Sequence, residues 1–429
     1  MYSFARSIMQ LTPLDVIRID ELISNLPHDY EKTARDSRAF LRARVIRSPA
    51  ELIHLVLLYC GADQALREVA GTITLLGESI SDTAVHKRLR ACGDWLKMLL
   101  EQMWFAGVTK LSGALRLILI DGSSLSVPGA DGTSYRLHLA IDLVKLEILH
   151  IEVTDKHVGE GLMHFPLREG DVVVVDRGYN HPADIIEITD KGTLLTLRLN
   201  PNSMRLHSVG GEKKINVFDL LSQTQTDQVC QEVWITSKDG EFVKAWLHAQ
   251  HLPEELRAEA RRKSRQNSKS KNVKQETLLY AEWTMILTTV PPDAMDTNAV
   301  MALYRLRWQV ELFIKRLKSI LDIDKLRCAE DSKLNKVWIY GKLLLATVLI
   351  RRTDKNFGIG GLAPEKPRDV TPWRFWKMIK NELKAIILAI GSWNSQHYAQ
   401  TKKVMTERPR KRQLQNLPPR IRELVERFS

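Results

Sequence analysis

The sequence contains few cysteines and no pattern that would pair them. Four cysteines occur among 429 residues, and none belongs to a Cys-x-x-Cys pair. This spacing argues against a zinc module and against a disulfide-stabilised scaffold. Isolated thiols are typical of proteins that stay in a reducing cytosol.

Long apolar runs are also missing. The longest, LLLATVLI at residues 343–350, is flanked by Lys342 and Arg351, whereas a bilayer span needs about 20 apolar residues. The first residues, MYSFARSIMQLTPLD, include no uninterrupted apolar stretch of secretory-signal length. We therefore expect a buried helix at 343–350 and no membrane partner.

Acidic residues are fewer than basic ones. Asp and Glu total 51 against 63 Lys and Arg, which gives a formal charge of +12. This excess favours polyanionic partners, of which nucleic acid is the first candidate. With 44% hydrophobic and 27% charged residues, the chain is predicted to be globular, and its length suggests two or three domains.

The first 110 residues are predicted to be helical. One helix is expected to begin after Ser48, with a proline in its first turn. A later helix, capped by Ser81, carries Lys87, Arg88 and Arg90. With the helix before it, this segment has the pattern of a helix-turn-helix, whose second helix would enter a DNA major groove. An ordinary helical hairpin with a solvated basic face explains the same pattern, so both interpretations stay open.

From about residue 115 the pattern changes to strands. Three strands come first, followed by a short helical segment, a strand of four valines, a helix and a fifth strand, at 115–122, 134–143, 145–155, 159–165, 171–175, 181–192 and 193–199. This order predicts an α/β (α+β) fold with a ribonuclease-H-like mixed sheet as its core, and it leaves the chemistry open.

The rest of the chain is predicted to be a β-rich insertion followed by helices. The insertion includes a strand candidate at 214–221 and a basic stretch at 261–275, which is expected to be an exposed loop or a frayed helix. The predicted domains are a helical DNA-binding domain at 1–112, the catalytic core at 113–200 and 291–350, the β-rich insertion at 201–290, and a helical C-terminal region with a basic tail at 351–429.

Two aspartates end predicted core strands. Asp121 follows LRLILI, and Asp176 follows the four valines. A β-branched run of this kind is typical of a central strand that helices cover on both faces. Open α/β sheets place their ligand sites at the carboxyl ends of such strands. Asp142 and Asp155 also end predicted strands, but turn and cap roles are commoner for such residues.

The segment 303–321 is predicted to be one amphipathic helix. Its apolar residues form a stripe that is expected to be buried: Leu303, Leu306, Val310, Phe313, Ile314, Leu317 and Leu321. Tyr304, Arg307, Glu311 and Lys318 fall in a separate arc beside that stripe. A solvated helix face with ion pairs would show the same pattern.

The spacing Tyr-x2-Arg-x3-Glu-x6-Lys resembles the signature of DDE transposases of the insertion-sequence-four type. The motifs IDGSS and VDRGY resemble the two aspartate motifs of that family, and the resemblance extends over about residues 115–350. It implies that Asp121, Asp176 and Glu311 are the catalytic residues and hold two Mg²⁺ ions, for which Mn²⁺ can substitute. Carboxylates suit this task because Mg²⁺ prefers oxygen ligands and two ions stabilise both the attacking and the leaving oxygen.

The remaining signature residues are expected to contact DNA. We expect Arg307 and Lys318 on phosphates, Arg307 by bidentate contact and Lys318 as a point charge. Tyr304 either contacts a phosphate or supports the helix. Arg177 either holds a phosphate or pairs with a neighbouring carboxylate.

The resemblance also assigns a role to one tryptophan. In family members a tryptophan of the β insertion stacks on a flipped base, and Trp283 stands at the matching distance before Tyr304. Trp234 and Trp246, in the same insertion, are predicted to be core residues.

The expected function is cut-and-paste transposition. The chain would bind the terminal inverted repeats of its own element, nick one strand and transfer the 3′-hydroxyl to target DNA, with a hairpin intermediate implied by the resemblance. We expect a homodimer on paired double-stranded DNA ends, in the bacterial cytoplasm at the nucleoid. The alternatives are a catalytically inactive or domesticated DNA-binding protein and a ribonuclease-H-like nuclease that acts on other DNA structures.

Overall fold

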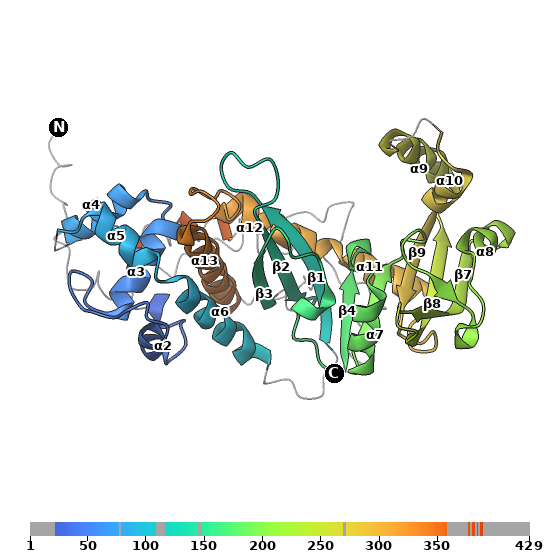
Figure 1. The fold of residues 1–429 in the computed structure, drawn as a ribbon, viewed down its shortest axis with the longest axis horizontal. Coiled ribbons are helices and arrows are strands. Elements are labelled where there is room, and N and C mark those ends of the chain that lie inside the picture. Colours follow the sequence, from blue (N-terminus) through green and yellow to red (C-terminus); the bar gives the residue numbers. More distant parts are fainter. Residues whose placement is uncertain are drawn as a thin grey trace. The chain divides into compact units, whose positions relative to one another are not determined.

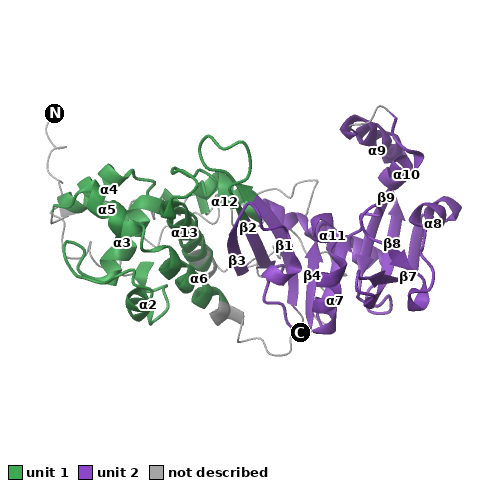
Figure 2. Cartoon of the chain, in the orientation of Figure 1, with its two compact units in different colours: residues 1–110, 124–136, 313–411 green, residues 111–123, 137–312, 412–429 purple. Residues whose placement is uncertain are grey.

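The computed structural model describes residues 22–76, 79–108, 116–144, 147–268 and 272–357, together with 376–377, 380–381, 384 and 387–388. The chain forms two compact units (Figure 2). Unit 1 comprises residues 1–110, 124–136 and 313–411, and unit 2 comprises 111–123, 137–312 and 412–429. Unit 2 thus groups the predicted insertion with most of the predicted core. The predicted basic tail lies outside the described residues.

The helices that lie wholly in unit 1 are α2 Tyr30–Asp36, α3 Pro49–Cys60, α4 Leu66–Leu76, α5 Asp82–Leu89, α6 Gly93–Val108 and α13 Lys333–Phe357 (Figure 1). Two of them, α3 and α5, begin where the sequence predicts. The Ser48 hydroxyl accepts a hydrogen bond from the Glu51 amide at 3.2 Å, and Ser81 caps α5 in the same way. The predicted helix at 343–350 lies within α13, and residues 343–349 are buried. No helix among the described residues is long and apolar enough to span a bilayer.

A mixed nine-stranded sheet has the order β3-β2-β1-β4-β5-β9-β8-β7-β6. Its strands are β1 Arg116–Leu125, β2 Tyr135–Asp142, β3 Ile148–Asp155, β4 Asp171–Val175, β5 Leu194–Arg198, β6 Leu206–His207, β7 Gln228–Thr236, β8 Phe242–His251 and β9 Trp283–Thr288. Strands β1, β4 and β5 are parallel neighbours, and the strands from β9 to β6 pair antiparallel. The predicted ribonuclease-H-like α/β fold is confirmed.

Strand β4 is buried along its whole length, as the valine run predicts. Helix α7, Pro182–Asp190, buries its isoleucines and packs on β5, β7 and β8. Because the strand has no solvent face, the aspartate that follows it is the first residue able to reach solvent. This arrangement positions a carboxylate at the sheet edge.

The insertion differs from the prediction in two places, and a third part of it agrees with one of two open alternatives. The strand candidate at 214–221 is mostly helical, because Asn216 accepts from the Phe218 amide and caps α8, Val217–Gln223. Residues 261–267 of the basic stretch lie in α9, Glu254–Asn267, which agrees with the helical alternative, and Gln275 begins α10, Gln275–Glu282; neither helix has a buried residue (Figure 1). Trp234 and Trp246 are half-buried rather than core residues, because they alternate with the buried residues of β7 and β8.

A buried ion pair joins the first residues of β1 and β4. Arg116 donates to both oxygens of Asp171, at 2.7 and 2.6 Å, and Asp171 also accepts from the Arg168 amide at 2.9 Å. The side chain of Asp171 is only 2% exposed. Since Arg116 and Asp171 are register partners, the pair fixes the alignment of these two strands.

Removing the Asp171 carboxylate should therefore destabilise the protein. We expect Asp171→Ala to lower the free energy of unfolding by about 3–5 kcal/mol, because it leaves a guanidinium without its anion in a buried position. Urea unfolding followed by circular dichroism measures this change. The matched control is Glu232→Ala, which breaks an exposed pair with Lys244 and should cost at most about 1 kcal/mol. Equal effects of the two variants would contradict the assignment.

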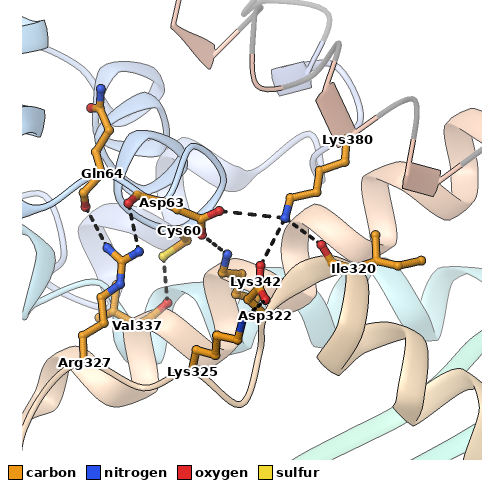
Figure 3. A network of polar contacts seen from close by, with 10 residues as sticks. All are labelled: Cys60, Asp63, Gln64, Ile320, Asp322, Lys325, Arg327, Val337, Lys342 and Lys380. Atoms are coloured by element: carbon orange, nitrogen blue, oxygen red, sulfur yellow. Dashed lines mark hydrogen bonds and ion pairs between the residues drawn. The ribbon is translucent and has the colours of Figure 1, made fainter. Parts of the chain in front are cut away.

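A second polar network lies inside unit 1 (Figure 3). The fully buried Lys342 of α13 donates to Asp63, and its ammonium lies 4.4 Å from the Trp338 ring. Lys380 reaches Asp322 at 3.4 Å and Asp63 at 3.9 Å. Burial lowers the pKa of Lys342, and Asp63 opposes that shift. The network ties the turn after α3 to α13 and to the segment around residue 380.

The loss of stability caused by breaking this network should depend on which partner is replaced. We expect Asp63→Asn, which suits the left-handed backbone at this position (φ +60°), to destabilise by about 3–5 kcal/mol because a buried ammonium loses its anion. Lys342→Met should cost clearly less, since it removes the charge together with its need for a partner. Thermal or urea unfolding of both variants measures the difference, and a greater loss for Lys342→Met would refute this account.

Candidate functional site

The parallel register places Asp121 and Asp176 side by side. Leu119 of β1 is the partner of Val174 in β4, so two residues further on Asp121 lies level with Asp176. In the same way the pairing of Val175 with Leu197 sets Asp176 level with Arg198 on β5. Neighbouring strands lie about 4.8 Å apart. Two carboxylates and a guanidinium therefore share one sheet edge in unit 2.

The backbone after β4 turns at once and holds Asp176 in place. Asp176 caps the 3₁₀ turn η3, Arg177–Tyr179, by accepting from the Gly178 amide at 2.6 Å. Tyr179 is fully buried. The side-chain amide of Asn180 donates to the Arg177 carbonyl at 2.7 Å and to the Arg198 carbonyl at 3.4 Å. These contacts fix the direction in which the strand end presents its carboxylate.

The predicted helix 303–321 is two helices. They are α11, Thr297–Leu306, and α12, Trp308–Leu321, with Arg307 as the residue between them. The backbone amide of Arg307 donates to the Tyr304 carbonyl, three residues earlier in the chain, at 3.0 Å. The tightened turn at Arg307 is the physical reason for the break. All seven residues of the predicted stripe are buried, so the predicted packing face is confirmed.

Arg307, at the junction of the two helices, links Glu311 to the sheet edge. Its guanidinium donates to Glu311 and lies 3.8 Å from Asp121. The same group lies 5.6 Å from the ring centroid of Tyr304. The side chains of Arg307 and Asp121 are 15% and 16% exposed, so water screens this attraction only weakly. The structure thus brings the third predicted acid next to the first.

The carboxylates influence one another electrostatically. Burial raises the pKa of Asp121 to about 7, and Asp176 and Glu311 add to that rise, while Arg307 and the Gly122 amide oppose it. Burial also raises the pKa of Tyr304, against the effects of Arg307 and Arg198. Because burial disfavours the charged form of Asp121, a bound cation would stabilise its carboxylate.

The donor chemistry of these side chains fits a hard divalent cation. Asp121, Asp176 and Glu311 offer only oxygen atoms, which Mg²⁺ prefers. Among the described residues, however, no group of three Asp, Glu, His or Cys side chains stands arranged around a metal position. Arg307 lies between Asp121 and Glu311 instead. Asp142 and Asp155 accept from backbone amides two residues on, at 2.8 Å each, which agrees with turn roles.

The other signature residues occupy different surroundings. Arg177 is exposed and makes no ion pair with a described residue. Lys318 lies two helical turns beyond Glu311 on α12 and donates to the Ser124 carbonyl at 3.1 Å. Tyr304 is largely enclosed, with its ring against Arg307.

The predicted DNA-binding residues of α5 do not form one uniform face. Lys87 and Arg90 are exposed. Arg88 instead donates to the Arg42 carbonyl at 2.7 Å and lies 5.8 Å from the Phe40 ring. The helix spans only eight residues, and both interpretations of this segment remain predictions.

Trp283 is buried in the structure. It is 4% exposed, and its ring stacks on His251 with centroids 4.4 Å apart. The indole nitrogen is buried without a hydrogen-bond partner among the described residues, which costs about 1–3 kcal/mol. A base can therefore reach this ring only after the side chain moves, and its assigned role stays a prediction.

Sequence reasoning missed two residues near the site. Arg198 stands beside Asp176 only because β5 pairs with β4, although an arginine at a strand end next to the valine strand was a usable signal. Trp308 follows Arg307 and is 43% exposed. Its position inside the Tyr-Arg-Glu-Lys signature could have drawn attention to it.

Comparisons with known proteins agree with this geometry. The model of the family described as "Transposase DDE domain" matches residues 112–348. The chain is 32% identical over 338 residues to the transposase of insertion sequence element IS421 from Escherichia coli, covering 75% of this chain and 90% of that protein. It is equally identical over 337 residues, with the same coverage, to InsL, the protein assigned as transposase to element IS186A in Escherichia coli strain K12.

A more distant relative comes from another genus. The transposase of element IS231F from Bacillus thuringiensis subsp. israelensis is 27% identical over 309 residues, which cover 64% of this chain and 63% of that protein. The family match spans more than half of the chain and includes both aspartates and the whole Tyr-Arg-Glu-Lys signature. This chain therefore belongs to the DDE transposases of insertion sequences.

Proposed function

We propose that this transposase cuts the ends of its own insertion sequence and joins them to target DNA through Asp121, Asp176 and Glu311. The observation that supports this best is the sheet register, which sets Asp121 level with Asp176 while Arg307 ties Glu311 to Asp121. Three carboxylates from two strands and a helix are thereby gathered in unit 2. The net positive charge of +12 suits a polyanionic substrate.

The three carboxylates would hold Mg²⁺, or Mn²⁺ in its place. When bound, two such ions supply Lewis-acid stabilisation of the attacking and leaving oxygens. Asp176 follows the rigid strand β4, and Glu311 lies in the first turn of α12. Their carboxylates would therefore keep fixed positions around the cations, because residues on regular elements hold a geometry better than residues on loops. Water serves as nucleophile in the nicking step, and a 3′-hydroxyl serves in strand transfer.

Basic side chains around the carboxylates would receive DNA phosphates. Arg307 presents a planar fork for bidentate contact, and Lys318 presents a point charge on the same helix face as Glu311. Arg177 is exposed beside Asp176 and lacks an ion pair within the described residues, which favours the phosphate role over pairing with a carboxylate. Arg198, level with Asp176, is a further phosphate contact.

Cleavage of the second strand through a hairpin requires a base to leave the duplex. Base stacking on an aromatic ring is worth about 1–3 kcal/mol. Trp308 already offers an exposed ring beside Arg307, whereas Trp283 offers one only after leaving His251. We include both tryptophans in the proposed hairpin step. We also propose that the chain acts as a homodimer on paired inverted repeats.

The central test removes one carboxylate. We expect Asp176→Ala to abolish nicking of DNA that spans both ends of the element, while binding to those ends stays largely intact, because the change deletes a metal ligand and no phosphate contact. A gel assay with Mg²⁺ or with EDTA measures cutting, and a gel-shift assay measures binding.

The matched control is Asp190→Ala, which removes an exposed carboxylate at the end of α7 and should cut like the wild type. Normal cutting by Asp176→Ala would refute the assignment. Tight binding without cutting by the wild-type protein would instead favour the catalytically inactive DNA-binding protein.

A second test concerns the shape of the Arg307 cation. Arg307→Lys keeps the positive charge but replaces the planar guanidinium by an ammonium. A single planar group can then no longer contact Glu311, Asp121 and a phosphate together. We expect the cleavage rate to fall by about 100-fold, in the range seen when one preorganised donor is lost, with a smaller effect on binding to the ends. Single-turnover cleavage kinetics measure the rate, and unchanged kinetics would rule out a fork-specific role.

A further inference from the structure

The helix pair α9 and α10 concentrates positive charge. Residues 257–274 include eight Lys and Arg and a single acid, Glu259. This segment therefore carries +7 of the chain's formal charge of +12. The two further acids of α9, Glu254 and Glu255, lie in its first turn, where the helix dipole favours them. The basic excess is thus local and does not reflect the composition of the whole chain.

Core packing does not explain this helix pair. Neither α9 nor α10 contributes a buried residue. Helix α9 packs on α10, and α10 contacts α8 and β9. Figure 1 shows the pair projecting from the sheet beside β9. Since most helical stability in proteins comes from tertiary packing, the feature of these helices that needs an explanation is their exposed surface.

Two arginines attach α9 to its neighbours in unit 2. Arg257 donates to the Leu252 carbonyl at 2.7 Å and to Asp227 at 3.2 Å. Arg261 donates to Glu282, the last residue of α10, at 2.7 Å. These contacts fix the orientation of α9, so the cations on its outer surface keep a defined position.

The outer cations of the pair are four exposed side chains: Arg262, Lys263, Arg265 and Lys274. Arg262 and Lys263 share one acid, Glu259, at 4.0 and 2.7 Å. Arg265 and Lys274 make no ion pair with any residue that the structure describes. The outer cations therefore exceed the anions that the protein places near them.

Repulsion between cations also acts along α9. Arg257, Arg261 and Arg265 follow one another at intervals of four residues, so they share one helix face. Like charges at this spacing destabilise a helix. A bound polyanion would offset the repulsion, and the phosphates of a DNA strand form a polyanion with regularly spaced charges.

We propose that the outer cations of α9 and α10 contact the phosphates of target DNA. The inference rests on the proposed function, which makes double-stranded DNA the substrate. The ends of an element have one sequence, which is read at base edges. An element that moves meets different target sequences, and contacts to phosphates hold a duplex without reading its sequence. Lys and Arg on an exposed helix suit this second task.

The experiment measures how the full-length protein binds a labelled DNA duplex of unrelated sequence. Fluorescence anisotropy gives the affinity over a range of salt concentrations. The arm variant replaces all four outer cations by glutamine. We expect its affinity in low salt to fall by about tenfold or more, and its salt slope to fall by about 2–4, because each lost phosphate contact removes about 0.9 from the slope. Wild-type affinity and slope would overturn the proposal.

The matched control removes the same number of charges elsewhere. It replaces four exposed lysines by glutamine: Lys191, Lys238, Lys325 and Lys336. The two variants have the same net charge, so a contact made by the outer cations predicts a large loss only in the arm variant. Equal losses would show a general electrostatic effect and would refute a specific surface.

A further pair of variants separates charge from fold. Arg262→Lys with Arg265→Lys keeps both charges and should retain most of the affinity, because a lysine also binds phosphate as a point charge. Arg262→Gln with Arg265→Gln should lose about half of the slope change seen in the arm variant. Equal losses in the lysine and glutamine pairs would contradict a phosphate contact.

The same assay separates this inference from the proposed function. Asp176→Ala should bind the unrelated duplex like the wild type, so the result does not depend on cutting. If the arm variant binds normally while the wild-type protein nicks the element's ends, only the inference about α9 and α10 is refuted. If the arm variant loses affinity but the wild-type protein never nicks the ends, the proposed function fails, and the target role fails with it. Loss of affinity for the element's ends alone would likewise overturn the assignment to target DNA.

Discussion

Parallel pairing of β1, β4 and β5 is the constraint on which the site depends. The register sets Asp121, Asp176 and Arg198 at one level, and a slip by one residue would turn each side chain to the opposite face. The acids at the two ends of the valine run oppose such a slip, because it would carry Asp171 or Asp176 into the buried part of the strand. The Arg116 pair at the start of the same strands adds a polar restraint.

Charge balance is the second constraint. Burial raises the pKa of Asp121, and the carboxylates of Asp176 and Glu311 add to that rise by repulsion. Arg307 offsets part of this repulsion by contacting Asp121 and Glu311. The same guanidinium is suited to a phosphate, so in the proposed function Arg307 would serve both the charge balance of the free protein and the recognition of DNA. A site with these demands cannot be optimised for stability alone.

Local patterns predicted much of the fold. The valine run, the caps at Ser48 and Ser81, and the apolar stripe of 303–321 were each readable over a few residues. The errors came from competing local signals. Asn216 caps a helix where the apolar residues suggested a strand, and the tight bond at Arg307 divides a helix whose periodicity continues across the break.

The sequence by itself determined that a buried apolar run precedes each aspartate, which helix face is apolar, and the spacing of the Tyr-Arg-Glu-Lys signature. These properties follow from periodicity and propensity within one segment. The sequence did not determine where β1 ends, because this strand continues past Asp121 to Leu125. Only the tertiary structure decided that Arg198 lies beside Asp176, that Arg307 lies close to Asp121, and that Trp283 stacks on His251. Such neighbours come from separate segments, and strand order, register and packing of the whole unit decide which side chains meet.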